Sequence, residues 1–587
     1  MKTLILVEKE SAGERISEFL DCESRNGHWE SSQYIVVAER GHLLNMWLSL
    51  RGKSLSDLPE TDVFYRIPKR SREKTILIQK LYRECDDIIV ATDFDREGEV
   101  IGGKMVDYLL NQKNALHNVF IANPRNIQRV YFSALIDSEL KRAFNNIMPM
   151  REGLLTKGLA RNYADAVVGL NLTKALTIIF KMNFDSLRQA MSMGRVQSPL
   201  LAHINKRTSI TYNKQCKPFE SKERENITYI ETLQGDIQVP LKVVSDEVEL
   251  QSYETIKFKH TQAQHFPDTA TIQSELPFSP EYSMHILESL YLKGYSTYPR
   301  THSHYLPKEF INQLVPLMDL KENFNSNNCL KVEGDHELPH WAISLTPEGI
   351  IALRQEKLKG GEKIVAEYLF TKICRAIAPP LEIEELQAKI RADSQIHTIK
   401  WGQTCKNVED AIGHYSFKYN PQIPLGKYRI KKVNSIKTEV VSLDEAFKPE
   451  INVFTNKDLV KWMNEVGIGT EATRHTFPLV LQQRNYTDNQ NLTNRLGNVV
   501  SSIIETIGLD TNLTSEMENK IESITHLSEL EDFMQWTTFT TQNMLKNLRS
   551  INKEIVFTCP KGHNVKLINT RKALLLRCDT CKKWYTL

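Results

Sequence analysis

The sequence predicts a multidomain chain that opens with a parallel α/β domain and continues in alternating helical and β-rich segments. At 587 residues it is too long for one hydrophobic core. Apolar runs and helical patterns alternate over residues 1–140, which favours a parallel sheet covered by helices. Beyond residue 140, helical spacing and short alternating β segments replace one another several times. We therefore expect about three to five domains, with a functional site at the carboxyl edge of the first sheet.

The first domain is expected to contain parallel strands separated by helices. Short apolar runs place strands at Thr3–Val7, Tyr34–Ala38, Asp87–Ala91 and Asn118–Ala122. A helix is expected at Ser11–Leu20, where apolar residues recur at helical spacing. Because the carboxyl ends of parallel strands meet at one edge of a sheet, side chains that follow these strands should lie together.

The rest of the chain alternates in composition. The expected segments are α/β over 1–140, helical over 141–212, β over 213–272, helical over 273–376, β over 377–450 and helical over 451–550, with a small module over 555–587. This order fits six small domains, and it equally fits a nested chain in which separated segments combine. The pattern alone leaves both arrangements open.

Composition indicates an ordinary globular protein of the cytoplasm. Hydrophobic residues make up 41% of the chain and charged residues 25%. No uninterrupted apolar run approaches the roughly 20 residues that span a bilayer. Glu8 and Glu10 end the first apolar run too early for a signal peptide, so no membrane association is expected. The cysteines outside the C-terminal module are scattered, which suits free thiols in a reducing compartment.

The overall charge neither favours nor excludes nucleic acid. Lys and Arg number 75 against 72 Asp and Glu. A nucleic-acid surface would have to be a local basic groove, with compensating acids elsewhere in the chain.

Three acids follow the third expected strand within one short turn. Asp93, Asp95 and Glu97 offer carboxylate oxygens, which Mg²⁺ prefers together with water and phosphate oxygens. Glu8 ends the first strand and should face the same crevice, as a further ligand or as a proton donor whose pKa the neighbouring acids would raise. Acids after strands are also common as solvated loop residues or helix caps, and the motif on its own leaves that alternative open.

A tyrosine followed by proline and arginine is the second chemical motif. A phenol that attacks a phosphodiester needs deprotonation, in-line placement and nearby cations, and Arg300 supplies a guanidinium two residues from Tyr298. Pro299 disfavours a helix at Tyr298, so the phenol should lie on an extended, exposed stretch. Tyrosines are also common packing residues, and that role is expected for the neighbouring Tyr291. Together the two motifs predict phosphoryl transfer between DNA and a tyrosine.

The C-terminal module carries a set of metal-ligating side chains. Cys578 and Cys581 have the spacing of a structural zinc knuckle, and Cys559 with His563 offers a looser second half. Short β-like runs around them are typical of a zinc ribbon. The alternative is a degenerate ribbon that folds without metal.

Ordered motifs over most of residues 1–550 resemble the type IA DNA topoisomerases, and within them the topoisomerase III branch. The motifs are, in order, Val7-Glu8-Lys9, Gly41-His42-Leu43, Asp93–Glu99, Arg161–Asn171, Ser192–Ser198, Tyr298-Pro299-Arg300-Thr301, His340–Ile343 and Gly467–Arg474. The sequence departs from the family pattern at His302, where the family has aspartate, and at Glu471, where it has proline. His302 could weaken a hydrogen bond that orients the arginine, or add a cation near the phosphate.

The resemblance implies a nested fold with a central hole. Residues 1–140 would be a Toprim metal-binding domain and residues 273–376 a helical nucleophile domain with Tyr298. The helical segments 141–212 and 451–550 would form a base, the β segments 213–272 and 377–450 an arch, and residues 555–587 a zinc-ribbon-like module.

The resemblance also implies an ATP-independent DNA topoisomerase. It would cleave single-stranded DNA through a 5′-phosphotyrosine, pass a strand and religate, relaxing negative supercoils or decatenating DNA. The catalytic residues would be Tyr298, Glu8, Arg300, Lys9 and His340, and Glu8, Asp93, Asp95 and Glu97 would hold Mg²⁺. DNA would be contacted by His42, Arg161, Asp165, Ser192, Gly194, Arg195, Val196, Gln197, Arg300, Arg474 and Arg484, with base stacking on Tyr163 and Trp462. The enzyme is expected to be monomeric, with DNA as its partner and a possible structural Zn²⁺.

Two other functions remain compatible with the motifs. A Toprim nuclease or primase would need the acids but not Tyr298. A DNA-binding remnant would keep the clamp but would have lost turnover through His302. A covalent adduct between protein and DNA separates the topoisomerase from both alternatives.

Overall fold

The computed structural model describes most of the chain. The described residues are 2–39, 41–111, 121, 127–183, 190–213, 226–230, 237–239, 247–260, 264–330, 340–380, 382–405, 425–434, 453–550, 563, 566–569 and 574–586. Cys559 and all but one residue of the predicted strand Asn118–Ala122 lie outside this part.

The first domain is built on a seven-stranded sheet with strand order β2-β3-β4-β1-β7-β8-β9. Its strands are β1 (Thr3–Val7), β2 (Glu23–Arg25), β3 (His28–Glu30), β4 (Tyr34–Ala38), β7 (Asp87–Val90), β8 (Gln128–Arg129) and β9 (Met148–Pro149). The helices α1 (Glu10–Phe19), α2 (Arg72–Tyr82), α3 (Arg96–Asn111) and α4 (Asp137–Phe144) accompany it, with a hairpin of β5 (Asn45–Leu48) and β6 (Val63–Arg66). The predicted strands at Thr3–Val7 and Tyr34–Ala38 are confirmed at their full length.

The register of the central strands brings several acids to one edge. Strands β1, β4 and β7 are parallel, and Val7 pairs with Ala38. Their apolar side chains are buried on both faces, as in sheets covered by helices on both sides. Because the strands end level, Glu8 after β1 and Glu39 after β4 start from neighbouring positions, and the acid loop after β7 follows alongside.

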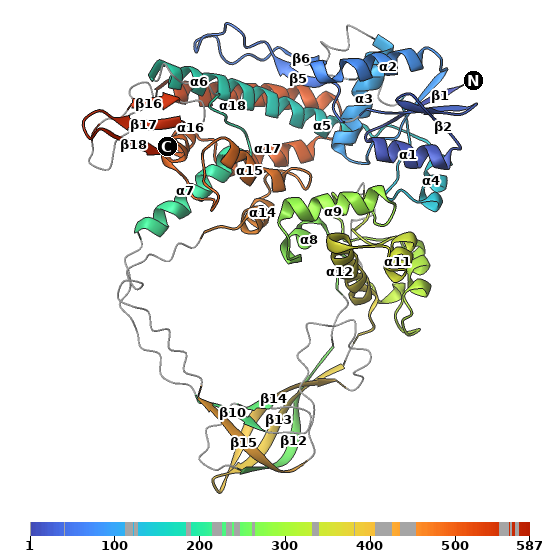
Figure 1. The fold of residues 1–587 in the computed structure, drawn as a ribbon, viewed down its shortest axis with the longest axis vertical. Coiled ribbons are helices and arrows are strands. Elements are labelled where there is room, and N and C mark those ends of the chain that lie inside the picture. Colours follow the sequence, from blue (N-terminus) through green and yellow to red (C-terminus); the bar gives the residue numbers. More distant parts are fainter. Residues whose placement is uncertain are drawn as a thin grey trace.

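Two helical segments far apart in sequence share one core. The first contains α5 (Glu152–Ala164), the π-helical turn η4 (Asp165–Leu170), α6 (Asn171–Asn183) and α7 (Gln197–Asn213). The second contains α14 (Asn456–Glu465), α15 (Phe477–Gln483), α16 (Arg495–Ile507), α17 (Thr511–Ser523) and α18 (Ser528–Ser550). Buried side chains of both segments form a single apolar cluster, and their helices lie side by side in Figure 1.

One continuous helical stretch, Glu152–Met182, is long and apolar enough to cross a membrane by length and composition. Its most apolar window is 56% buried inside the protein. Side chains of this stretch belong to three apolar clusters, so packing accounts for its composition.

A second helical domain leads into Tyr298. It contains α8 (Thr269–Glu275), α9 (Pro280–Leu292), α10 (Lys308–Leu314), α11 (Pro347–Arg354) and α12 (Gly360–Ile377) around their own apolar core. Helix α9 begins at Pro280, and the Ser279 hydroxyl caps it by accepting from the Tyr282 amide. Gly294 follows the helix at φ +72° and turns the chain back, a conformation that favours glycine.

The β-rich segments combine in one sheet of order β11-β10-β15-β12-β13-β14. Its strands are β10 (Asn226–Ile230), β11 (Ile237–Val239), β12 (Glu247–His260), β13 (Glu382–Ala392), β14 (Gln395–Cys405) and β15 (Gly426–Asn434). The sheet stands well apart from the helical and α/β parts (Figure 1). Strands from two separated segments therefore pair, as the nested arrangement requires, whereas the exact domain boundaries stay a prediction.

The chain ends in a three-stranded antiparallel sheet. It consists of β16 (Lys566–Asn569), β17 (Leu574–Cys578) and β18 (Lys583–Thr586) in the order β16-β17-β18. Cys578 is buried against the shared helical core, so the module is packed on the body of the protein.

Candidate active site

The acid loop after β7 and Glu8 after β1 meet at the carboxyl edge of the sheet. Glu8 is 8% exposed and Asp93 is 2% exposed. Burial raises the pKa of Glu8 well above its ordinary value, and Asp93 raises it further. Lys9 opposes this shift, and its Nζ lies 3.2 Å from Asp93 Oδ2. Glu8 is therefore a carboxyl group that favours its protonated form.

A buried arginine holds the backbone of the acid loop. Arg129 on β8 is fully buried and donates to the carbonyl oxygens of Thr92 and Asp93, both at 2.7 Å. Gly98 lets helix α3 approach the loop, because a Cβ there would lie 2.0 Å from the Asp93 carbonyl oxygen. The Gly98 amide donates to Asp95 Oδ1 at 2.7 Å. These contacts set the direction of the loop.

His42 belongs to the same acid cluster. Its Nε2 lies 3.0 Å from Glu97 Oε1. The hydrogen bond from His42 lowers the pKa of Glu97 to about 2, so Glu97 carries its charge across the working pH range. The predicted DNA contact of His42 remains a prediction, and in this structure its imidazole faces an acid.

Tyr298 lies against the acid loop although the two motifs are distant in sequence. The Tyr298 hydroxyl donates to Asp95 Oδ2 at 2.7 Å. The amide of Tyr298 donates to the Ser133 carbonyl of the first domain at 2.8 Å. Tyr298 is 1% exposed, so the expectation of an exposed phenol is wrong. Tyr298 is buried because the two domains pack against each other at this point. The expectation drawn from Pro299 could not include this contact between domains.

His340 stacks on the ring of Tyr298. The ring centroids are 3.9 Å apart and the planes meet at 24°. Burial lowers the pKa of His340 to about 3, so the ring is neutral. Neither ring nitrogen has a partner among the described residues. The imidazole therefore holds the phenol in place and keeps two unused polar atoms.

Arg300 is held beside the site by an acid of helix α9. Its Nη2 donates to Glu288 Oε1, and its Nε is buried without a partner in the described part of the chain. Arg300 also contributes to the electrostatics of Glu8 and Tyr298, where it lowers both pKa values against the larger effect of burial. The charge of Arg300 thus lowers the pKa of both Tyr298 and Glu8.

A cavity of about 350 Å³ opens in front of these groups. It is lined by residues of the acid loop, α5, the segment Arg300–His302, α17 and the turn before η9 (Arg474–Thr476). His302 and Glu471, the two departures from the family pattern, both line it. The charge of His302 contributes to lowering the pKa of Glu471, although Arg474 does so more strongly against the opposing effect of burial. An exposed imidazole and a carboxylate therefore face the same space.

A second cavity of about 390 Å³ adjoins the first at Arg161. It is lined by most of the residues predicted to contact DNA, namely Arg161, Asp165, Ser192, Gly194, Arg195, Val196, Gln197 and Arg484. Arg484 is exposed at this cavity, and Arg161 is partly exposed. The structure thus brings most of the predicted set together along one path that leads to Arg300 and His340.

Two of the predicted DNA-binding arginines are buried and engaged within the protein. Arg195 is 1% exposed and forms ion pairs with Asp165 at 2.8 Å and Glu518 at 3.1 Å. Arg474 is 8% exposed and donates to the Ile468 and Gly469 carbonyl oxygens. Direct phosphate contacts by these two stay predictions, and the geometry favours a role in shaping the path.

The two aromatic residues expected to stack on bases differ in their exposure. Tyr163 is 2% exposed and its hydroxyl lies 3.0 Å from Thr538 Oγ1, so it is a packing residue and the expectation is wrong. Trp462 is partly exposed and stacks on His203, with centroids 3.8 Å apart.

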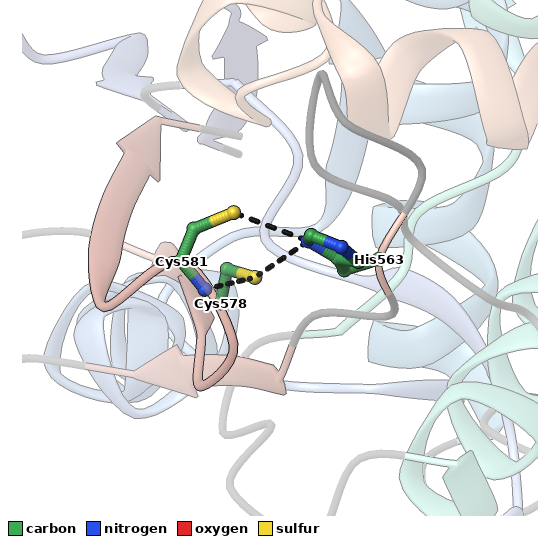
Figure 2. Close-up of side chains that lie close together, drawn as sticks. All are labelled: His563, Cys578 and Cys581. Atoms are coloured by element: carbon green, nitrogen blue, oxygen red, sulfur yellow. Dashed lines mark hydrogen bonds between the residues drawn. The ribbon is translucent and has the colours of Figure 1, made fainter.

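Cys578, Cys581 and His563 converge as Figure 2 shows. Ligand atoms of His563, Cys578 and Cys581 all lie within 4.8 Å of one another. His563 Nδ1 is 3.1 Å from Cys581 Sγ and 3.9 Å from Cys578 Sγ. Two sulfurs and an imidazole nitrogen at such separations fit tetrahedral Zn²⁺. The fourth predicted ligand, Cys559, lies outside the described residues.

The acid cluster supplies the donor type for a hard divalent cation, although within the described residues its carboxylates do not converge as the ligands around His563 do. Glu8, Asp93, Asp95 and Glu97 supply only carboxylate oxygens, the donor type that Mg²⁺ prefers. Asp93 is buried and pairs with Lys9, and Asp95 Oδ2 accepts the hydrogen bond from the Tyr298 phenol. To hold a cation, both carboxylates would have to turn toward it from these partners.

Residues that the sequence did not single out complete the site. Glu39 is 1% exposed, and its Oε1 has no partner among the described residues. It ends an apolar strand as Glu8 does, and that parallel was the available signal. Arg129 stands in the apolar run Ile127–Phe132, where a buried charge is unusual. Glu288 carries no sequence signal beyond helical spacing, and Tyr291 was expected only as a packing residue.

Comparison with known proteins agrees with the resemblance seen in the sequence motifs. The family model described as DNA topoisomerase matches residues 150–534, and the Toprim domain model matches residues 3–135. DNA topoisomerase 1 of Methanocaldococcus jannaschii is 25% identical over 646 residues, which cover 99% of this chain and 81% of that protein. DNA topoisomerase 3 of Staphylococcus aureus strain USA300 is 25% identical over 669 residues, covering 99% and 88%. The structure of full-length topoisomerase I from Thermotoga maritima superposes with a TM-score of 0.65 at 20% identity, covering 100% of this chain and 97% of the other.

The fold and the acid edge define a Toprim enzyme, a class that uses a divalent metal ion. Because the topoisomerase model covers well over half of the chain, the chain belongs to the DNA topoisomerase family, in its type IA class. It cleaves one DNA strand, passes DNA through the break and reseals it. The predictions of family, fold class and enzyme activity are confirmed. Relatives named 1 and 3 match about equally well, so the predicted topoisomerase III branch stays a prediction.

Proposed function

We propose that Tyr298 is the nucleophile of this topoisomerase and that cleavage joins it to a 5′ phosphate. The contact between Tyr298 and Asp95 is the observation that supports this most directly. Attack forms a bond from the phenol oxygen to phosphorus and breaks the bond from phosphorus to the 3′ oxygen. The phenol proton passes to Asp95. Glu8, whose pKa burial raises, gives its proton to the leaving 3′ oxygen and takes it back on religation.

Cations and a neutral ring support this step. Arg300 and Lys9 stabilise the charge that develops on the phosphate, since both lie at the acid edge beside the nucleophile. His340 acts as a neutral hydrogen-bond donor to the phosphate and holds the phenol by stacking. The covalent bond conserves the energy of the phosphodiester, so the cycle needs no ATP.

We propose that the divalent ion is Mg²⁺ and that Asp93, Asp95 and Glu97 hold it, with Glu8 close to the ion. When bound, it supplies positive charge that offsets the acids around the phosphate. Lys9 retains its contact with Asp93 and orients that carboxylate. We also assign Zn²⁺ to His563, Cys578 and Cys581, with Cys559 as the fourth ligand.

Single-stranded DNA lies along the two adjoining cavities in this proposal. Arg161 and Arg484 contact phosphates directly, while Arg195 and Arg474 shape the path from within. His302 adds a cation near the scissile phosphate when it is protonated. We further propose a monomeric, cytoplasmic enzyme of the topoisomerase III branch that favours decatenation of DNA with single-stranded regions.

Trapping of the covalent intermediate tests the proposal. Single-stranded oligonucleotides labelled at either end are incubated with protein and Mg²⁺ and then denatured. The 3′-labelled fragment should stay on the protein, the 5′-labelled fragment should be released, and Tyr298→Phe should form no adduct. An adduct on the 5′-labelled fragment, or free 5′-phosphate ends without adduct, contradicts the proposal and favours a nuclease. DNA binding without any cleavage favours a binding remnant.

A further inference from the structure

Arg300 is held at its backbone and at its guanidinium by helices of its own domain. Thr269, the first residue of α8, accepts a hydrogen bond from the Thr301 amide at 2.9 Å and donates one to the Pro299 carbonyl oxygen at 2.8 Å. Glu288 of α9 accepts a hydrogen bond from Arg300 Nη2. Because all these residues belong to one helical domain, Arg300 keeps its partners when that domain moves as a unit.

The ion pair with Glu288 leaves one donor of Arg300 unused. Arg300 Nε is buried and has no partner among the described residues. Arg300 lines the cavity of about 350 Å³ in front of the acid loop, whereas Glu288 lines a different cavity of about 680 Å³ between α1 and α9. Glu288 thus holds the guanidinium without lining the cavity in which the proposed function places DNA.

The orientation of the guanidinium decides how Arg300 meets a phosphate. Arginine binds phosphate oxygens through a planar set of N–H donors, so its contacts depend on direction as well as on charge. A carboxylate that fixes this direction before DNA arrives reduces the ordering that cleavage itself must supply. Glu288 also places a negative charge beside Arg300, which weakens the attraction of the site for DNA. Loss of the carboxylate therefore slows cleavage if orientation matters more, and speeds it if charge matters more.

We propose that Glu288 is a positioning residue for cleavage, which fixes the Arg300 guanidinium so that its Nε–H meets the phosphate that Tyr298 attacks. Glu288 touches neither the DNA nor the reacting atoms, and it acts through Arg300 alone. This inference rests on the proposed function, in which Tyr298 is the nucleophile and Arg300 stabilises charge on the phosphate.

Two substitutions of Glu288 test this role in single-turnover cleavage of a labelled single-stranded oligonucleotide with Mg²⁺. Glu288→Ala should lower the rate constant at saturating DNA by about tenfold, the size of one hydrogen bond between charged groups. The DNA concentration that gives half of the maximal rate should stay the same or decrease, because a negative charge is removed. Glu288→Gln keeps an oxygen that accepts from Arg300, and it should recover part of the rate.

Arg300→Ala tests whether Glu288 acts through Arg300. The rate of the double variant Arg300→Ala/Glu288→Ala should agree with that of Arg300→Ala within about twofold, because the group that Glu288 orients is already absent. A role of Glu288 in packing alone would lower the rate by the same factor in both backgrounds.

Glu362→Ala is the matched control. Glu362 on α12 also binds α9, where it accepts a hydrogen bond from Ser289 at 2.7 Å, and this variant should cleave as the wild type does. An unchanged or higher rate in Glu288→Ala, an equal loss in Glu362→Ala, or an equal loss from Glu288→Ala without Arg300 overturns the proposal. Adduct formation by Tyr298→Phe would instead overturn the proposed function, whatever the rates of the Glu288 variants.

Discussion

The Tyr298 hydroxyl donates a hydrogen bond to Asp95 Oδ2 at 2.7 Å, across 203 residues of sequence. Burial raises the pKa of Tyr298 well above its ordinary value, and Asp93 and Asp95 raise it further. The phenol is 1% exposed, so a DNA strand cannot reach it in this form. The structure is thus a closed state in which Tyr298 is protonated. Under the proposed function, the helical domain that carries Tyr298 must move away from the acid loop before DNA enters.

Asp95→Asn should lower the rate of adduct formation by about a hundredfold, because the amide cannot take the phenol proton and is a poorer metal ligand. Single-turnover cleavage of a labelled oligonucleotide measures this rate. Asp137→Asn is a suitable control, since Asp137 is exposed and pairs with Arg15 away from the site. Equal rates for Asp95→Asn and the control would remove Asp95 from the mechanism.

Glu8→Gln should abolish the pH dependence that Glu8 imposes on cleavage. Burial and Asp93 raise the pKa of Glu8, so the wild-type carboxyl stays protonated to a higher pH than an ordinary glutamate. Wild-type cleavage should therefore decrease as pH rises through this raised pKa. The variant should be slower by about a hundredfold or more and should lack that decrease. Cleavage rates over a pH series decide the matter, and the same decrease in the variant would assign it to another group.

Glu39→Gln should stabilise the metal-free protein at neutral pH. Burial raises the pKa of Glu39 well above its ordinary value, and Glu8 adds to this. A raised carboxyl pKa contributes stability below the unfolded-state value of about 4.3, and that contribution is lost as pH rises toward the folded-state value. The gain from the substitution should be about 1–3 kcal/mol at pH 7 and should shrink near pH 4.

Chemical unfolding at both pH values measures the effect of Glu39→Gln. Glu531→Gln, at an exposed position of α18, is the control and should change little. A variant that is less stable than the wild type at pH 7 would mean that Glu39 has a stabilising partner in solution.

Cys581→Ser should lose Zn²⁺ without unfolding the rest of the enzyme. Its sulfur is one of the ligand atoms that converge on His563, and the serine oxygen is a poorer zinc ligand. Metal analysis should find one Zn²⁺ per wild-type chain and none in the variant. The control variant Cys374→Ser changes a buried cysteine of α12 and should contain as much Zn²⁺ as the wild type. A wild-type protein that is purified with zinc in the medium and contains none would favour the degenerate ribbon.

Local sequence signals predicted helices and strands but not the contacts between domains. The strand Thr3–Val7 and the acids that follow Asp87–Val90 were predictable, because continuous apolar runs and their flanking charges are local features. The burial of Tyr298 was not predictable, since it depends on contact between domains. Arg195 looked like a phosphate ligand until its partners Asp165 and Glu518 were known. Glu39 and Glu288 matter through neighbours that only the fold supplies.

Peptide mapping of the trapped adduct tests the central claim most directly. The protein is incubated with single-stranded DNA and Mg²⁺, denatured and digested with nuclease and protease, and the modified peptide is sequenced by mass spectrometry. Our account predicts a nucleotide bonded to Tyr298 through a 5′ phosphate, with no modification of the adjacent Tyr291. A nucleotide on Tyr291 or on any other residue would contradict the account.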